Sequence, residues 1–318
     1  MVIDSSYLAL LERLFSTSEN LDSLKVKQIR IISPSGVIDP SYIDGASARL
    51  RAWGFAVSEG KHVRSSWGRF AGTDEERLSD LIEALNDPTV DAILCSRGGY
   101  GLQRIIDRVP AITKPIIGFS DITELHQLSA ISNQFSVHGI MCKHIATLPE
   151  DSDPIVSLRK LLAGEALEYR WAAHPLNNPG HACAPIVGGN LSVLYGLQAT
   201  PWGLQQSAFR IQFPILLIED IGERHYHIDR MMRNLRMSGV LAHLSGLVVG
   251  QFSDCEDDPL MQQSVYETIK EVVADYDYPV LFNAPIGHVA HNLPLWLNRH
   301  ATIQSDTESI LLQDGLLV

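Results

Sequence analysis

In the first half of the chain, short apolar runs alternate with segments whose apolar residues recur at helical spacing. The runs that we predict to be buried strands lie at 27–33, 90–95 and 115–119, and a further strand begins at 54. Alternating strands and helices form a parallel sheet with helices on both faces. Residues 25–150 are therefore predicted to be an N-terminal, flavodoxin-like α/β domain.

The chain has 318 residues, which is more than one typical domain. Residues 151–180 contain turn-forming Pro, Asn and Asp residues around one helix-like segment, and we interpret them as a linker. Residues 181–318 again mix strand and helix patterns and are expected to form a C-terminal mixed α/β domain. Residues 1–24 are interpreted as an N-terminal extension with one helix at 7–15.

Composition argues against several kinds of partner. The formal net charge of -12 disfavours nucleic acid. No apolar run is long enough to span a membrane, and the N-terminus lacks a signal-peptide pattern, so a cytoplasmic protein is expected. The four cysteines form no CxxC motif, which indicates reduced thiols. No metal or other cofactor is expected, and the GxGxxG fingerprint of a nicotinamide dehydrogenase is missing.

Ser120 stands where a buried strand meets a helix-like segment. A hydroxyl becomes a useful nucleophile when a base removes its proton and donors stabilise the oxyanion. The free amides at the start of a helix can supply such donors. The alternative is a simple helix cap, because 121–124 fits a capping box, and the G-x-S-x-G elbow is only half present.

The segment 97–101, Arg-Gly-Gly-Tyr-Gly, follows another predicted strand. Its glycines would let a ligand or an oxyanion approach bare backbone amides, although a tight turn explains them equally well. Ligands collect at the carboxyl ends of parallel strands. Because this loop and Ser120 both lie at such ends, they are expected to face one site.

Two further candidate catalytic residues stand at the ends of predicted strands in the second half of the chain. Glu219 closes an apolar run, and a carboxylate in that position needs a partner, either a histidine that it orients or a cation such as Arg224 or Arg230. His288 follows a strand in a Pro/Gly-containing loop, with His291 as the alternative imidazole.

In combination, these segments resemble the LD-carboxypeptidase family of serine peptidases, which includes the microcin-immunity peptidases. The resemblance covers most of the chain from residue 31 to residue 288. The blocks that carry it are Ala71-Gly-Thr-Asp-Glu-Glu-Arg77, Arg97-Gly-Gly-Tyr-Gly101, Gly118-Phe-Ser-Asp121, Gly188-Gly-Asn190, Leu217-Ile-Glu-Asp220 and Gly287-His288.

The resemblance implies a Ser-His-Glu triad in an interdomain cleft, with its three members at Ser120, His288 and Glu219. The implied oxyanion donors are backbone amides, one at Asp121 and one at Gly98 or Gly99. Arg97 and Tyr100 are the candidate substrate-binding residues.

The implied enzyme is a homodimeric hydrolase without a metal. It releases the C-terminal D-alanine from cytoplasmic muropeptides during cell-wall recycling. A microcin-immunity activity on a peptidyl-nucleotide is the alternative within the family. A two-domain small-molecule binding protein without catalysis is the alternative of another class.

Overall fold

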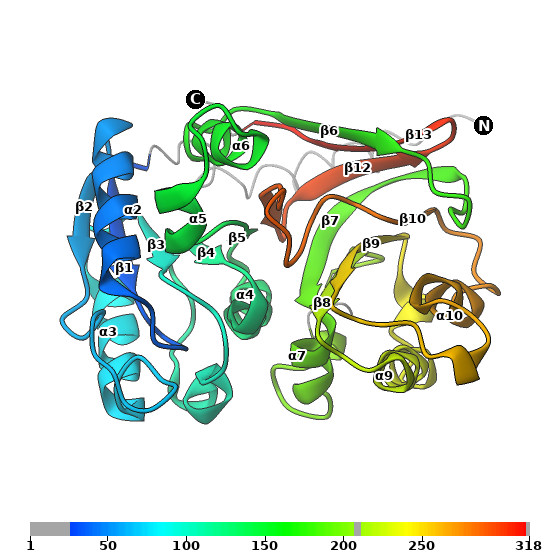
Figure 1. Ribbon diagram of the computed structural model, residues 1–318, viewed down its shortest axis with the longest axis horizontal. Coiled ribbons are helices and arrows are strands. Elements are labelled where there is room, and N and C mark those ends of the chain that lie inside the picture. Colours follow the sequence, from blue (N-terminus) through cyan, green and yellow to red (C-terminus); the bar gives the residue numbers. More distant parts are fainter. Residues whose placement is uncertain (1–25, 207–210, 316–318) are drawn as a thin grey trace, which may run out of the picture.

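The computed structural model describes residues 26–206 and 211–315. Two β-sheets, each accompanied by helices, lie side by side (Figure 1). The helix expected at 7–15 lies outside the described residues. Within the described part of the chain, no helix is both long and apolar enough to cross a bilayer.

The first sheet has six strands in the order β11-β5-β4-β3-β1-β2. Its strands are β1 (Gln28–Ile32), β2 (Ala56–Glu59), β3 (Ala92–Cys95), β4 (Ile116–Gly118), β5 (Ser136–His138) and β11 (Leu295–Leu297). β1 to β5 are parallel, whereas β11 is antiparallel to β5. The helices that accompany it are α2 (Pro40–Ala52), α3 (Asp74–Asn86), α4 (Thr123–Ile131) and α5 (Cys142–Thr147). The predicted parallel-sheet α/β architecture is confirmed, with one antiparallel edge strand added.

Two helices of the first half begin at residues that favour helix starts. α2 follows Asp39, whose side chain accepts a hydrogen bond from Ser41 N, and has Pro40 in its first turn. α3 follows Thr73, which forms a reciprocal capping box with Glu76. These caps stabilise the ends of helices that pack against the first sheet.

The second sheet has seven strands in the order β10-β9-β8-β7-β12-β13-β6. Its strands are β6 (Leu167–Ala172), β7 (Gly180–Asn190), β8 (Ile215–Ile221), β9 (Gly246–Ser253), β10 (Val280–Leu281), β12 (His300–Ser305) and β13 (Glu308–Gln313). β7 to β10 are parallel, and β12, β13 and β6 join antiparallel, so this half is mixed α/β as predicted. Its helices are α6 (Asp153–Leu162), α7 (Leu191–Gly196), α9 (His225–Met237) and α10 (Val265–Val272).

Two features tie the halves together. β11 comes from the last part of the chain and pairs with β5 in the first sheet. Asn190 N, at the end of β7, donates a hydrogen bond of 2.9 Å to Thr123 Oγ1 on α4. Residues 151–180, expected to be a linker, contain α6 and β6, and β6 is an edge strand of the second sheet.

Candidate active site

Ser120 lies in a sharp turn between β4 and α4. Its φ angle is 68°, in the left-handed region that side chains other than glycine rarely adopt. It begins a short 3₁₀ turn, Ser120–Ile122, which leads directly into α4, and neither element has a side-chain cap hydrogen bond. The structure therefore gives no support to the capping alternative. The turn resembles a nucleophile elbow in its strained backbone.

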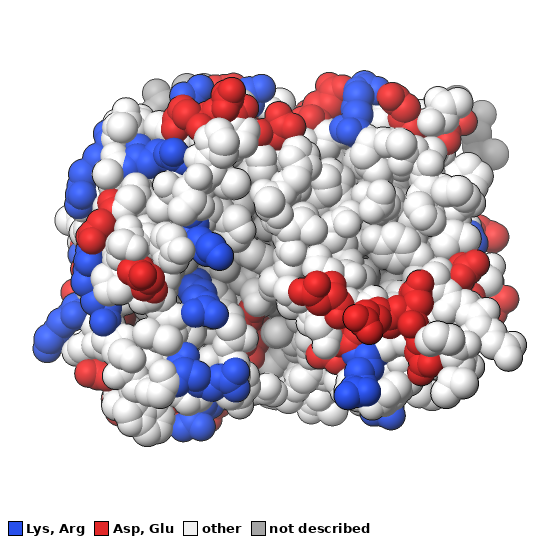
Figure 2. Space-filling view, in the orientation of Figure 1, with Lys and Arg blue, Asp and Glu red and all other residues white. Residues whose placement is uncertain are grey.

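A cavity of about 800 Å³ brings the expected residues of both halves together. Ser120, Arg97, Gly98 and Gly99 line it from the carboxyl ends of β3 and β4, and His288 lines it from the second half of the chain. The cavity lies between the two halves of the chain, where the resemblance leads us to expect the active site. In Figure 2, Lys and Arg side chains gather on the half formed by the first sheet, and acidic side chains gather on the facing half.

Glu219 and His288 form a buried hydrogen-bonded pair. The distance from His288 Nδ1 to Glu219 Oε2 is 2.7 Å, and the side chains are 14% and 0% exposed. Because a carboxylate can only accept, Nδ1 carries the proton and Nε2 is left as an acceptor. Among the described residues, the imidazoles of His288 and His138 lie within ion-pair range of Glu219, whereas Arg224 and Arg230 make no ion pair with it.

The two groups shift each other's pKa. Burial opposes ionisation of Glu219, but its contacts with His138 and His288 outweigh burial and lower the pKa of the carboxyl to about 2. Burial alone would lower the pKa of His288, but its hydrogen bond to Glu219 and the nearby negative charge raise that pKa above its ordinary value. The pair therefore combines a carboxylate that is ionised at neutral pH with an imidazole that is more basic than an ordinary histidine.

The glycine loop packs directly against Ser120. A Cβ atom built on Gly98 would lie 2.7 Å from Ser120 Cβ and 2.9 Å from Phe119 O, which is too close for any side chain. The Asp121 carboxylate secures the loop, because Oδ2 accepts from Leu102 N at 3.0 Å and from Ser35 Oγ at 2.5 Å. The loop backbone thus lies beside the serine.

Two protein-family sequence models, described as the LD-carboxypeptidase N-terminal and C-terminal domains, match residues 29–139 and 184–303, respectively. The chain belongs to the LD-carboxypeptidase family. A Bacillus subtilis (strain 168) protein named "Probable murein peptide carboxypeptidase" is 31% identical over 301 residues, which cover 91% of this chain and 92% of the relative.

Two solved structures share the fold. Muramoyltetrapeptide carboxypeptidase from Oxalobacter formigenes has a TM-score of 0.82 and 24% identity, covering 92% of this chain and all of that one. The microcin C7 self immunity protein, solved with aspartyl sulfamoyl adenosine, has a TM-score of 0.76 and 20% identity, covering 92% and 97%. Membership of the LD-carboxypeptidase family makes the protein a hydrolase, as expected, and these structures confirm the fold class.

The two predicted substrate-binding residues differ in position within this LD-carboxypeptidase fold. Arg97 lines the cavity, and its Nη1 donates to Val37 O at 2.6 Å. Tyr100 packs against Phe70, with ring centroids 6.0 Å apart, and the Arg69 guanidinium lies over its ring. Tyr100 is not among the residues that line the cavity.

Sequence reasoning missed three rings near the catalytic candidates, those of Phe119, His144 and His138, of which the first two line the cavity. The Phe119 ring lies near the imidazoles of His288, His138 and His144, at centroid distances of 4.9, 5.7 and 6.0 Å. His138 ends β5 and is fully buried. Its position at the carboxyl end of a parallel strand, the same signal that singled out Ser120, could have identified it.

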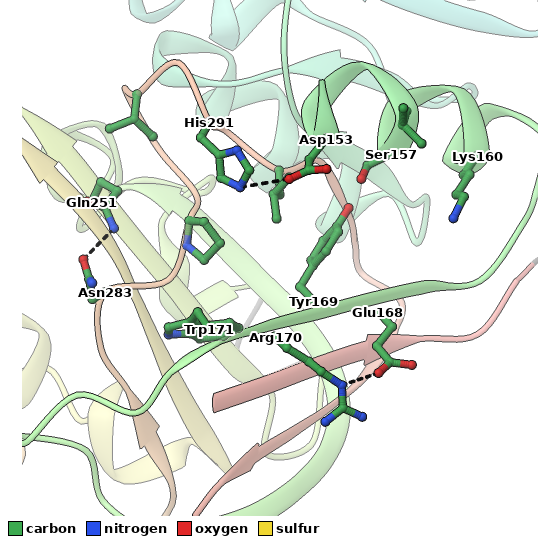
Figure 3. Close-up of a pocket in the computed structure, with 14 residues that line it drawn as sticks. Asp153, Ser157, Lys160, Glu168, Tyr169, Arg170, Trp171, Gln251, Asn283 and His291 are labelled. Carbon is green, nitrogen blue, oxygen red and sulfur yellow. Dashed lines mark hydrogen bonds and ion pairs between the residues drawn. The ribbon is translucent and has the colours of Figure 1, made fainter. Parts of the chain in front are cut away.

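A second cavity, of about 730 Å³, lies between α6, β6 and the loop at 283–293 (Figure 3). Of the expected site residues, it contains only the alternative imidazole, His291, whose Nε2 lies 3.7 Å from Asp153 Oδ2. Ser157, Asp153 and Glu168 also line this cavity, but Ser120 and Glu219, the serine and the carboxylate of the expected triad, do not. Within the described ranges, no group of three or more His, Cys, Asp or Glu side chains is arranged to hold a metal ion.

Proposed function

We propose that this protein is a serine-type LD-carboxypeptidase that releases the C-terminal D-alanine of a muropeptide. The observation that carries the proposal is the 2.7 Å contact between His288 and Glu219, made by an imidazole that shares a cavity with Ser120. The names of the relatives, which refer to murein peptides and to a muramoyltetrapeptide, support this choice of substrate.

In the proposed reaction, Nε2 of His288 removes the proton of Ser120 while Glu219 stabilises the resulting imidazolium. The Ser120 oxygen attacks the carbonyl carbon of the LD bond, and backbone amides of Asp121 and of Gly98 or Gly99 hold the oxyanion. Collapse breaks the C–N bond, and His288 returns its proton to the leaving amine. A water molecule then hydrolyses the acyl-serine by the same route.

A carboxypeptidase must also recognise the free carboxylate of its substrate. Two cationic side chains, Arg97 and Lys143, line the cavity. We assign terminal-carboxylate recognition to this side of the cavity, since an ion pair with a guanidinium can be bidentate. Cytoplasmic location, a role in cell-wall recycling and a homodimeric state are parts of the same proposal.

The direct test uses purified protein and an LD-linked tetrapeptide, with released D-alanine as the readout. Peptidyl-nucleotide hydrolysis is measured in parallel, because the microcin-immunity alternative predicts that this substrate is preferred. A nucleobase would need an aromatic platform. Trp171 lines the second cavity and Trp202 packs against a core cluster of the first half, so Tyr42 and Phe119, which line the cavity with Ser120, are the aromatic side chains available to it. Absence of both turnover and fluorophosphonate labelling would favour a binding protein without catalysis.

Gly98→Ala is expected to lower kcat by roughly 100-fold or more, as loss of an oxyanion donor does. The new methyl group would displace Ser120 or the glycine loop, given the 2.7 Å approach. Gly196→Ala is the control, because its Cβ would meet nothing closer than 3.5 Å. Equal kinetics for the two variants would contradict the proposed role of the loop.

The pH dependence follows from the raised pKa of His288. The imidazole must be neutral to accept the proton of Ser120, so kcat/KM should rise with pH through the pKa of His288. Because that pKa lies above its ordinary value of 6.5, the midpoint of the rise should lie above pH 6.5. A profile that is already flat from pH 5 upward would exclude His288 as the base.

A further inference from the structure

His138 lies at the carboxyl end of β5, in the interior of the first sheet. It is paired with Gly118 of β4 on one side and with Leu295 of β11 on the other. Gly118 is two residues before Ser120, and β11 follows the loop that carries His288. His138 is therefore fixed by the two segments that position these catalytic candidates, and its side chain is 0% exposed.

Glu219 uses only one of its two oxygens for His288. The other oxygen, Oε1, is buried and has no hydrogen-bond partner among the described residues. It faces Nε2 of His138 at 3.9 Å, which is within ion-pair range but too long for a hydrogen bond. Both ring nitrogens of His138 are also buried and without a partner in the described part of the chain. Leaving buried polar atoms without a hydrogen bond costs free energy. If the two side chains approached by roughly 1 Å, His138 Nε2 and Glu219 Oε1 would form a hydrogen bond with each other.

We propose that His138 is a positioning residue, which donates its Nε2 proton to Glu219 Oε1 once the two atoms approach by roughly 1 Å. The contact would fix the rotation of the carboxylate and keep Oε2 on Nδ1 of His288. It would also join the first sheet, which carries Ser120, to β8 of the second. This inference rests on the proposed triad and adds a residue that acts through Glu219.

The surroundings of His138 suit this role. His126, whose ring centroid is 6.3 Å from that of His138, bonds through Nε2 to Gly118 O at 3.0 Å. Burial lowers the pKa of His126 to about 3, so His126 is neutral and brings no competing cation to the carboxylate. The Phe119 ring lies 5.7 Å from that of His138, whose side chain has no exposure to water.

Two variants of His138 with side chains of similar size distinguish the effect of its hydrogen-bond donor from the effect of the space that it fills. The amide nitrogen of glutamine in His138→Gln can occupy the position of the imidazole Nε2, whereas His138→Met fills the space without a donor. We expect the methionine variant to lose kcat by about 10- to 100-fold at unchanged KM, as loss of a hydrogen bond to a charged group implies. The glutamine variant should recover most of that loss. Equal activity of the two variants would overturn the proposal.

The background variant Glu219→Gln shows whether the effect passes through the carboxylate. In that background, His138→Met should cause no further loss, whereas a full additional loss would contradict the inference. If the methionine variant does not fold, His138→Asn can replace it. The shorter asparagine side chain holds its NH₂ group too far from Glu219 Oε1, so this variant should lose as much kcat as the methionine variant. Ser120→Ala tests the triad separately: if it retains turnover, the proposed function fails, whatever the His138 variants show.

Discussion

Replacing Ser120 with alanine is expected to reduce D-alanine release by about 10⁶-fold, the scale at which loss of a serine nucleophile acts in a triad. No other hydroxyl would occupy the turn beside Gly98, so the acyl-enzyme could not form. Substrate binding should persist, because the cations that line the cavity are unchanged. The measurement is steady-state release of D-alanine from an LD-linked tetrapeptide, with binding followed by calorimetry.

The alanine variant should fold as the parent does. Both residues carry a Cβ, so the cost of the left-handed backbone at residue 120 is the same in each. Ser79→Ala, on the exposed side of α3, is the matched control and should keep full activity. Retention of more than about a thousandth of the activity by Ser120→Ala would exclude a covalent serine mechanism.

Glu219→Gln is expected to lower kcat by about 10⁴-fold with little change in KM. The amide has no charge to stabilise the imidazolium, and its NH₂ group can turn towards Nδ1 and favour the wrong tautomer. The same change removes the main influence that raises the pKa of His288, so the residual activity should rise with pH at a lower midpoint than in the parent. A pH–rate profile of the variant measures both effects.

Glu223→Gln supplies the comparison for this prediction. Glu223 follows the same strand, but its side chain is 28% exposed and pairs with His227 at 3.0 Å. It has no contact with His288 among the interactions described, and its loss should leave turnover within about twofold of the parent, as is usual for surface substitutions. An inactive Glu223→Gln beside an active Glu219→Gln would reverse the assignment of the carboxylate.

The first half of the site could be predicted from local patterns. Parallel strands end at one edge of their sheet, so a serine after one strand and a glycine loop after its neighbour must lie close together, as Ser120 and Gly98 do. The choice of His288 over His291 depended on the family resemblance. From the residues alone both remained open, because the direction of a loop side chain depends on tertiary packing.

Other features were hidden by their context. β6 alternates apolar Leu167 and Tyr169 with polar Glu168 and Arg170, as an edge strand does, but the Pro- and Asn-containing stretch after it favoured a linker. β11 has only three residues, too few for a pattern to indicate which sheet it joins. The strand-end position of His138 could single it out, but a buried histidine gives no sequence signal of its partner in the other half, so nothing linked His138 to Glu219.

The return of the chain into the first sheet limits how this protein can be rearranged. A gene cut between residues 150 and 181 would deliver β11 with the wrong fragment and leave β5 as an unpaired edge strand open to aggregation. Chimeras that exchange halves between relatives would therefore have to carry the 295–297 segment together with the N-terminal fragment. An exchange of halves within this fold therefore needs two crossover points, one between the halves and one beside the 295–297 segment.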